Sequence, residues 1–446
     1  MFARAATVCA ALLMLGGAAW GNGRNAATIS VVSSGADIFV GATYGGVLSR
    51  DGGRSFGWIC EDALGYGGPY DPELTIGPGG VLMATTFTGL ARSEDHGCSW
   101  GNAQGDLAGH AVSGIALAGG SAVVAVTASG GRTNGIFRST DGGRTFTAVA
   151  GTARAADLWT SVRASAGGQR VYASSYTTAP PSTTLWVSTD AGQSFNPIAF
   201  APGGASDYRL LGVDRSDPMV LWARTTDDFT SNDRILRSGN GGTSFTSVFT
   251  TTEVVTQLAQ SGTTTLLSTR PSGIARAPDG IAFTTVPGPH VIGIAPEGAT
   301  GLLGCTSDPL DGHSLARSTD QATSWTPIYR QRNLAGVIDC PAGAVASWLA
   351  GAPAGSRETR ALCTPQWSIV ALQLGVVPPD DAGLPDAAPP DAPSPDAAQI
   401  DDGGDGCGCR TGAGGGKSIA PLLALLALLL CRGTSGRRRR AGSSGR

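Results

Sequence analysis

The chain has 446 residues and a formal net charge of −3, and only 15% of its residues are charged. It contains 67 Gly, about twice the usual share, and 26 Pro. This composition argues against coiled coils and helical bundles and favours many short strands joined by glycine-rich turns. Residues 22–377 carry 22 Arg against 26 Asp and Glu, a net charge of 22 − 26 = −4. They offer no basic face to a nucleic-acid backbone, so we expect no nucleic-acid partner.

Residues 1–22 have the pattern of a secretory signal peptide. Arg4 precedes an apolar run from Ala5 to Leu15, and small residues suited to cleavage by signal peptidase follow. A buried N-terminal helix is the alternative. Cys9 lies inside the apolar run, and we assign it no role. Export leads to an oxidising compartment, so the other cysteines are interpreted first as potential disulfides.

An eight-residue motif with the pattern S-x-D-x-G-x-[ST]-[FW] recurs six times along the middle of the chain. Its third position is occupied in turn by Asp51, Asp95, Asp141, Asp190, Asn240 and Asp320. These positions are 44, 46, 49 and 50 residues apart, followed by a gap of 80. A copy shortened by one residue, at 277–283, lies in the middle of that gap. A further unit at 361–367 is suggested by a Trp in the same register.

Units of this length with several short strands indicate a β-propeller. An apolar strand precedes the motif and another begins at its aromatic residue, so we expect the motif to be the hairpin between the last two strands of a blade. The Asp accepts bonds from nearby N–H groups, and the Gly adopts the left-handed conformation that the turn requires. The motifs are therefore interpreted as structural. We expect the copies with Asn240 and Ala322 to be less well tied.

The motifs resemble the Asp-boxes of BNR-repeat propellers, which occur in sialidases, in the sortilin ectodomain and in related exported proteins. The resemblance implies an all-β domain over residues 26–375, a single propeller of four-stranded antiparallel blades. Seven blades are preferred because that closure is the commoner one in these families, and the spacing also admits eight. Sialidases carry an Arg-Ile-Pro motif early in the first blade, and this chain has none. Xyloglucanase-like families use two tandem propellers, whereas this chain has room for one.

Five cysteines lie in the repeat region: Cys60, Cys98, Cys305, Cys340 and Cys363. The odd number leaves at least one thiol without a partner in the domain. We expect Cys60 to pair with Cys98 across neighbouring blades and Cys340 to pair with Cys363 in the closing blade. The four His residues provide no recognisable catalytic context for a Cys. No metal-binding spacing occurs, and we expect no cofactor.

The connection after the first motif concentrates carboxylates and tyrosines. These residues are Glu61, Asp62, Tyr66, Tyr70, Asp71 and Glu73. They form either a sugar or calcium site at one face of the propeller, or a solvated loop with a turn-forming Asp-Pro step.

The C-terminal part of the chain has two segments of different composition. Residues 378–404 repeat Pro-Asp and contain almost nothing apolar, so we expect a disordered, extended linker. In residues 405–446, Cys407 and Cys409 precede an apolar run at 419–431 and the cluster Arg437, Arg438, Arg439 and Arg440. The apolar run has 13 residues, fewer than the roughly 20 that span a bilayer. The Arg cluster would hold it in orientation on the cytoplasmic side.

This tail resembles the MYXO-CTERM sorting domains of myxobacterial-type surface proteins. The resemblance covers about the last 40 residues and implies processing near the cysteine pair, lipid attachment at Cys407 or Cys409, and loss of the apolar helix. A plain C-terminal membrane anchor and a zinc ligand pair are the alternatives.

The sequence as a whole predicts an exported propeller anchored at the cell surface or outer membrane. Its partners in export would be signal peptidase and a sorting protease, and its ligand an unidentified protein or glycan. A non-catalytic function is preferred. A surface glycoside hydrolase without the sialidase motifs is the alternative.

Overall fold

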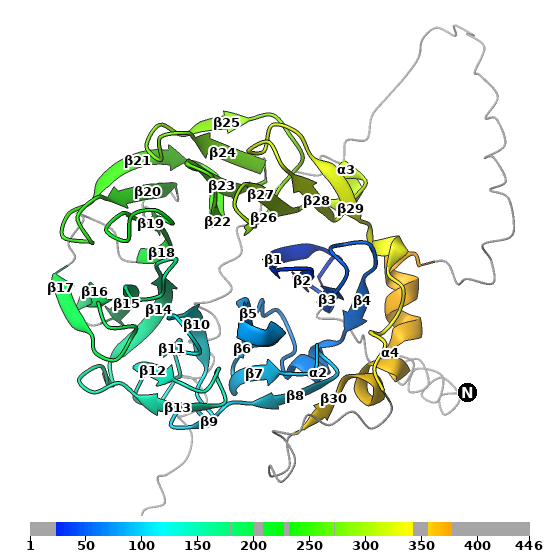
Figure 1. The fold of residues 1–446 in the computed structure, drawn as a ribbon, viewed down its shortest axis with the longest axis horizontal. Helices are drawn as coiled ribbons and strands as arrows, with labels where there is room; N and C mark the ends of the chain where they lie inside the picture. Colours follow the sequence, from blue (N-terminus) through cyan, green and yellow to red (C-terminus); the bar gives the residue numbers. More distant parts are fainter. Residues whose placement is uncertain are drawn as a thin grey trace, which may run out of the picture. The chain divides into compact units, whose positions relative to one another are not determined.

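The computed structural model describes residues 24–178, 180–199, 208–226, 232–271, 273–341 and 356–376. These residues form seven sheets, each built on four antiparallel strands, which stand in a ring (Figure 1). The expected signal peptide, the 378–404 linker and the 405–446 tail, with Cys407, Cys409 and the Arg cluster at 437–440, lie outside the described residues. Within the described ranges, no helix combines the length and apolar character needed to cross a membrane.

Each blade is formed by four consecutive strands. Blade 1 contains β1 (Thr28–Ser34), β2 (Asp37–Ala42), β3 (Gly45–Ser49) and β4 (Gly57–Ile59). Blade 2 contains β5 (Leu74–Gly77), β6 (Val81–Thr86), β7 (Gly89–Ser93) and β8 (Ser99–Asn102). Blade 3 contains β10 (Val112–Leu117), β11 (Val123–Thr127), β12 (Ile136–Ser139) and β13 (Thr145–Ala148), extended by β9 (Gln104–Gly105). Blade 4 contains β14 (Asp157–Ala164), β15 (Val171–Thr178), β16 (Pro181–Ser188) and β17 (Asn196–Ala199).

The remaining three blades follow the same order. Blade 5 contains β18 (Tyr208–Val213), β19 (Leu221–Thr226), β20 (Asp233–Ser238) and β21 (Thr246–Thr251). Blade 6 contains β22 (Val254–Ser261), β23 (Thr264–Arg270), β24 (Gly273–Ala277) and β25 (Thr284–Val286). Blade 7 contains β26 (Gly293–Glu297), β27 (Gly301–Cys305), β28 (Leu315–Ser318) and β29 (Thr326–Tyr329). Short helices are α2 (Glu61–Leu64), α3 (Asp308–Asp311) and the 3₁₀ turns Pro78–Gly80 and Gln331–Asn333.

The structure confirms seven blades and leaves no place for an eighth. Residues 361–367, which the Trp register suggested as a further unit, lie in the helix α4 (Thr359–Leu374). Trp367 packs against Trp58 of blade 1 with ring centroids 5.8 Å apart. The aromatic register at this position therefore belongs to a helix on the outside of the ring and not to a blade.

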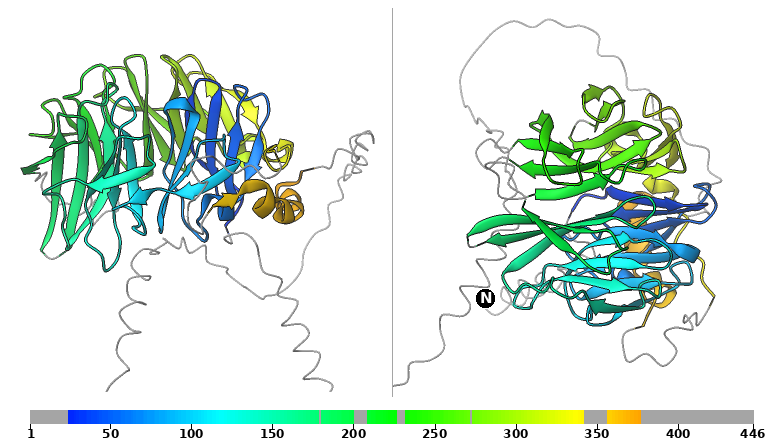
Figure 2. Two further views of the ribbon diagram at one scale, coloured as in Figure 1. Left: turned by 60° about the horizontal axis from the view of Figure 1, so that its bottom comes forward. Right: turned by 60° about the vertical axis from the view of Figure 1, so that its left-hand side comes forward.

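The apolar core is divided among the interfaces between blades. The first strand of each blade packs against the first strand of the next. The seven sheets therefore stand around a common axis, as the two views of Figure 2 show. Apolar clusters fill the spaces between neighbouring sheets, and Trp58, Trp100, Trp159 and Trp222 are among the largest fully buried side chains. Burial of large aromatic side chains dominates the stability of such interfaces.

All the repeated motifs occupy the same place in their blades, as the sequence predicted. Each lies between the third and fourth strands, and the shortened copy at 277–283 lies between β24 and β25. The aromatic residues of the first four motifs are buried: Phe56, Trp100, Phe146 and Phe195. The motif turns therefore stand at one end of the ring, opposite the hairpins that join second and third strands.

One recurring hydrogen bond links neighbouring blades at the motif turns. The carbonyl of the residue after the motif Asp accepts a donor from the preceding blade, at six of the seven junctions among the described residues. Side chains of Arg92, Arg138, Arg276 and Arg317 donate to the carbonyls of Gly142, Ala191, Gln321 and Gly52 at 2.9, 2.9, 3.4 and 2.9 Å. Arg50 donates to His96 and Trp222 to Gly280 in the same way. The bond from Arg317 joins blade 7 to blade 1.

Left-handed backbone at the accepting residue allows it to hold two blades at once. Its φ is 73° at Gly52, 72° at Gly142 and 56° at Ala191. The N–H groups of these residues donate within their own blade, to the carbonyls at positions 36, 121 and 169, at 2.9–3.0 Å. Because N–H and C=O point to different blades, a single turn residue fixes both its own sheet and its neighbour.

The C-terminal residues 330–341 and 356–376 lie against blades 1 and 2. The carbonyl of Gly336 accepts the Trp58 N–H at 2.7 Å, and the Ile338 N–H donates to the Trp58 carbonyl at 3.0 Å. The strand β30 (Arg357–Glu358) then pairs antiparallel with β8, and α4 follows. The four strands that form each blade are consecutive in the sequence, so none of these sets combines strands from the two ends of the chain. The contacts of the C-terminal residues with blades 1 and 2 therefore connect the end of the propeller sequence to its beginning.

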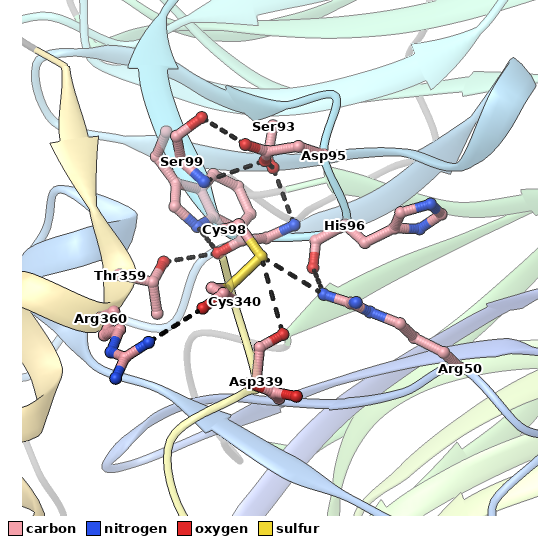
Figure 3. Close-up of a disulfide and its surroundings, with 12 residues drawn as sticks. Arg50, Ser93, Asp95, His96, Cys98, Ser99, Asp339, Cys340, Thr359 and Arg360 are labelled. Atoms are coloured by element: carbon pink, nitrogen blue, oxygen red, sulfur yellow. Dashed lines mark hydrogen bonds between the residues drawn. A yellow bond between two sulfur atoms is a disulfide. The ribbon is translucent and has the colours of Figure 1, made fainter. Parts of the chain in front are cut away.

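Two disulfides attach this segment, and their pairing differs from the expectation. Cys60 is bonded to Cys363 and Cys98 to Cys340, whereas Cys60–Cys98 and Cys340–Cys363 were expected. Figure 3 shows the second bridge beside the motif of blade 2. Sequence proximity misled the pairing, because the chain returns to blades 1 and 2 only after completing the ring. Cys305 is the buried free thiol.

We expect Arg317→Met to lower the free energy of unfolding by about 3 kcal/mol, and Arg138→Met by about 1 kcal/mol. Arg317 loses its bond to Gly52 and also leaves Glu297 without its partner at 2.6 Å, whereas Arg138 loses one bond to a carbonyl. Urea unfolding measures both values. An equal or larger effect of Arg138→Met would contradict the assigned role of Arg317 in closing the ring.

Removing one bridge with Cys60→Ser and Cys363→Ser is expected to cost about 4 kcal/mol of stability, because it spans 303 residues of chain. The measurement is thermal unfolding with and without a reductant. Reductant should lower the midpoint of the wild type strongly, that of the double variant less, and that of a variant lacking both bridges not at all. A wild type unaffected by complete reduction would exclude this role.

Candidate functional site

The motif carboxylates are saturated by bonds within their own turns. Oδ1 of Asp51 accepts the N–H groups of Arg54 and Ser55 at 2.9 and 3.0 Å, and Oδ2 accepts the Ser55 hydroxyl at 2.6 Å. The Ser49 hydroxyl donates to Asp51 at 2.8 Å and accepts the Gly53 N–H at 2.9 Å. The bonds from Ser55 hold the pKa of Asp51 well below its usual range.

The same bonds recur in the other motifs and depress carboxyl pKa values there too. Burial raises the pKa of Asp190, but the bonds from Ser194 and Ser188 outweigh it and lower the value to about 2. Bonds from Ser324 lower the pKa of Asp320 to about 2. The carboxylate oxygens are therefore used inside their own turns, where they hold the hairpin between the third and fourth strands.

The two altered copies keep the hydrogen bonds of the turn, although Asn240 makes them without a charge. Asn240 accepts the Ser244 N–H at 2.9 Å and donates its amide to the Ser244 hydroxyl at 2.8 Å. In the last copy, the Ala322 N–H donates to Ser318 at 3.0 Å. An amide can replace the carboxylate because its nitrogen reverses one hydrogen bond. The alteration appears instead in the backbone, where Ala322 has a left-handed φ of 66°.

The acidic connection between blades 1 and 2 divides into separate environments. Glu61 and Asp62 lie in the first turn of α2, and Gln366 of α4 donates to Asp62 at 2.9 Å. Glu73 lies just before β5, and its carboxylate pairs with Arg163 of blade 4 at 2.6 Å. Asp62 and Glu73 therefore have different partners within the protein.

Tyr66, Tyr70 and Asp71 do come together, with two residues that the sequence did not single out. The Tyr70 ring packs edge-on against the Tyr66 ring, with centroids 5.9 Å apart. It also contacts the Phe87 ring at a tilt, with centroids 4.3 Å apart. The Tyr70 hydroxyl is hydrogen-bonded to Thr85 at 2.8 Å. Asp71 forms an ion pair with Arg24 at 2.8 Å. We call Arg24, Tyr66, Tyr70, Asp71 and Phe87 the Tyr70 patch.

The patch stands at the end of the ring opposite the motif turns. Phe87 occupies the hairpin between β6 and β7, whereas the motif of blade 2 is the hairpin between β7 and β8. Burial raises the pKa of Tyr70, and burial with the nearby charges of Glu61 and Asp71 raises that of Tyr66 well above its usual value. Both tyrosines are therefore neutral hydrogen-bonding groups at physiological pH.

Arg24, Phe87 and Arg163 were not predicted, and only Phe87 carries a signal. An aromatic residue at the tip of the Thr86–Gly89 hairpin turn, where polar residues are usual, indicates an exposed ring. Arg24 and Arg163 lie 47 and 90 residues from their acidic partners, and nothing local identifies those pairs.

A metal site and a ligand hollow are the two other kinds of site to consider among the described residues. Among the described residues, no three His, Cys, Asp or Glu side chains are grouped to hold a metal ion, so a calcium site in residues 60–73 is not supported. A hollow of about 380 Å³ with a mostly apolar lining lies beside α4. It is lined by Asp62, Ala361, Leu362, Pro365, Gln366 and Ile369.

Comparisons with known proteins show the fold alone. No protein-family model and no curated protein matches the sequence. A puromycin-hydrolyzing peptidase of Mycobacterium tuberculosis is 15% identical with a TM-score of 0.49, covering 70% of this chain and 54% of its own. YCF48 from Cyanidioschyzon merolae is 12% identical with a TM-score of 0.46, over 68% and 98%. The GH74 enzyme of Niastella koreensis is 15% identical with a TM-score of 0.39, over 67% and 65%. This chain thus spans less than two thirds of the GH74 enzyme.

Replacing Asn240 by Asp is expected to stabilise the protein by about 1 kcal/mol at pH 7. The new carboxylate would have a depressed pKa, as Asp190 and Asp320 do at about 2, against about 3.9 in the unfolded chain. The gain should be complete above about pH 4 and disappear as the pH falls towards about 2.

Urea unfolding of wild type and variant across this pH range measures the effect. Asp190→Asn is the reverse control and should lose stability at pH 7 but not at pH 2. A gain from Asn240→Asp that is independent of pH would contradict the account.

Proposed function

We propose that this chain is an exported propeller, anchored at the cell surface, which binds a protein or a glycan without catalysing its conversion. The observation that carries this proposal is a contrast in the connection between blades 1 and 2. Asp62, Asp71 and Glu73 are engaged by partners inside the protein, whereas the Phe87 side chain, which packs against Tyr70 of the same connection, is 59% exposed. An ordered, exposed aromatic ring is typical of binding surfaces.

The engagement of the carboxylates argues against glycoside hydrolysis. Such enzymes place two carboxyl groups on either side of one glycosidic bond, roughly 5–9.5 Å apart, one as acid and the other as base or nucleophile. Here Asp71 is held by Arg24, Glu73 by Arg163 and Asp62 by Gln366. Each of these three carboxylates is therefore already engaged by another residue of the protein.

The two disulfides support export. Such bonds persist in oxidising compartments and are rare in the cytosol. Both bridges attach the segment that joins the ends of the ring, so the fold relies on them. The tail with Cys407 and Cys409, the apolar run and the Arg cluster supplies the anchoring part of the proposal, with signal peptidase and a sorting protease as partners in processing.

The proposal is tested on mature protein purified from the envelope of its native host. Intact mass should show a C-terminus near the Cys pair with an added lipid, lost in Cys407→Ala or in Cys409→Ala. The same protein should release no new reducing ends from soluble polysaccharides.

Two results would contradict the proposal. A cytoplasmic protein with reduced cysteines would exclude export. Hydrolysis that is abolished by Asp71→Asn with Glu73→Gln, in a variant that unfolds like the wild type, would establish a glycosidase instead.

A further inference from the structure

The exposed ring of Phe87 is held in place and does not move as a free side chain. Its neighbour Tyr70 packs against one side at 4.3 Å and is itself fixed by its hydroxyl bond to Thr85 at 2.8 Å. Leaving a Phe side chain in water forgoes about 1.5–3 kcal/mol of burial. The other large exposed apolar side chains among the described residues are aliphatic: Val254, Ile281, Leu310, Ile369 and Leu372.

An ion pair lies beside Tyr70, the residue against which the Phe87 ring packs. The guanidinium of Arg24 donates to the carboxylate of Asp71 at 2.8 Å and to the Tyr70 carbonyl at 3.4 Å. The side chains of Arg24 and Asp71 are 27% and 43% exposed. A carboxylate has about four acceptor positions, so Asp71 can accept a hydroxyl in addition to its ion pair.

A third group of the patch has an unmet hydrogen bond. Tyr66 is only 7% exposed, and its buried hydroxyl has no hydrogen-bond partner in the described structure. A buried polar group left without a partner costs about 1–3 kcal/mol. Tyr66 packs edge-on against Tyr70, whose carbonyl accepts a bond from Arg24, so the hydroxyl belongs to the same group of residues as the ion pair. A hydroxyl arriving between the ion pair and Tyr66 would supply the missing partner.

We infer that the Tyr70 patch binds a sugar ring of a neutral glycan, with the C–H face of the ring against Phe87 and a ring hydroxyl on Asp71. A pyranose combines an apolar face with adjacent hydroxyls in the space of one aromatic ring, and the patch offers the complementary groups over the same small area. The inference rests on the proposed binding function and names its ligand class and its site.

The alternatives fit the patch less well. A protein partner needs about 600–1,000 Å² from each side with an apolar centre, whereas here a single exposed ring borders charged groups. An acidic glycan would meet Asp71 and nearby Glu73, while Arg24 and Arg163 already neutralise those carboxylates. A neutral ligand avoids both the repulsion and the loss of the ion pairs.

The test is affinity electrophoresis of the full chain in gels that contain dextran, a mixed-linkage β-glucan, galactomannan or polygalacturonate. At least one neutral polysaccharide should retard the wild type. Phe87→Ala and Asp71→Ala should each weaken that binding at least about tenfold. Two matched controls should bind as the wild type does: Ile281→Ala, an exposed apolar residue at the motif end of the ring, and Asp62→Asn in the same connection.

Tyr66→Phe separates a ligand role from a structural one. Removing a hydroxyl that has no partner should raise the thermal midpoint slightly, while a lost ligand bond should weaken binding severalfold. A purely structural role would leave the affinity unchanged.

Each other outcome decides against the inference. It is overturned if no neutral polysaccharide retards the protein, if only polygalacturonate does, or if the controls weaken binding as much as Phe87→Ala. Capture of a protein ligand that is insensitive to Phe87→Ala would overturn this site and leave the proposed function standing. Hydrolysis of a polysaccharide bound at the patch would overturn the proposed function and leave the site.

Discussion

Among the described residues, the blades are linked through one backbone carbonyl in six of the seven motif turns. The residue after the motif Asp adopts a left-handed conformation, donates its N–H to its own blade, and accepts a side chain from the preceding blade. The Asp and Ser of the motif fix that residue by saturating the turn around it, as Asp51 and Ser49 do for Gly52. The motif therefore closes the hairpin of its own blade and also bonds that blade to the preceding one. Its last use, by Arg317 on Gly52, makes the first and last blades neighbours.

The sequence predicted those parts of the fold whose causes are local. A motif that needs Asp, Gly and an aromatic residue within eight positions marks a turn, and its recurrence marks the blades, including the shortened copy around Asp279. The acceptor role of the turn carbonyl was not predicted. Arg residues do precede several motifs, as Arg92 and Arg138 do, but their acceptors lie about 50 residues away. The four disulfide cysteines were predicted, but their pairing and α4 were missed for the same reason, since the C-terminal residues contact blades at the far end of the sequence.

The candidate site shows the same limit at a finer scale. Composition singled out residues 60–73, and three of their side chains do belong to one patch. Asp71 and Glu73 looked like potential ligands in the sequence because nothing local revealed their partners. Those partners are Arg24, in the N-terminal segment, and Arg163, in blade 4. Phe87 comes from a neighbouring hairpin. Which groups remain available to a ligand is decided by such distant partners, and that is a property of the assembled ring.

The C-terminal segment also gives the propeller a defined path for mechanical load. A pull on the chain beyond Val376 first meets α4, where Cys363 is covalently attached to Cys60 of blade 1. A second covalent attachment follows at Cys340, on the motif turn of blade 2. Tension applied there would therefore pass into blades 1 and 2 before it reached the strands of blade 7. Without the two disulfides, the same pull would act on β29 and break its hydrogen bonds to β28 one after another. With them, the C-terminal end of the propeller is held to blades 1 and 2 by covalent bonds.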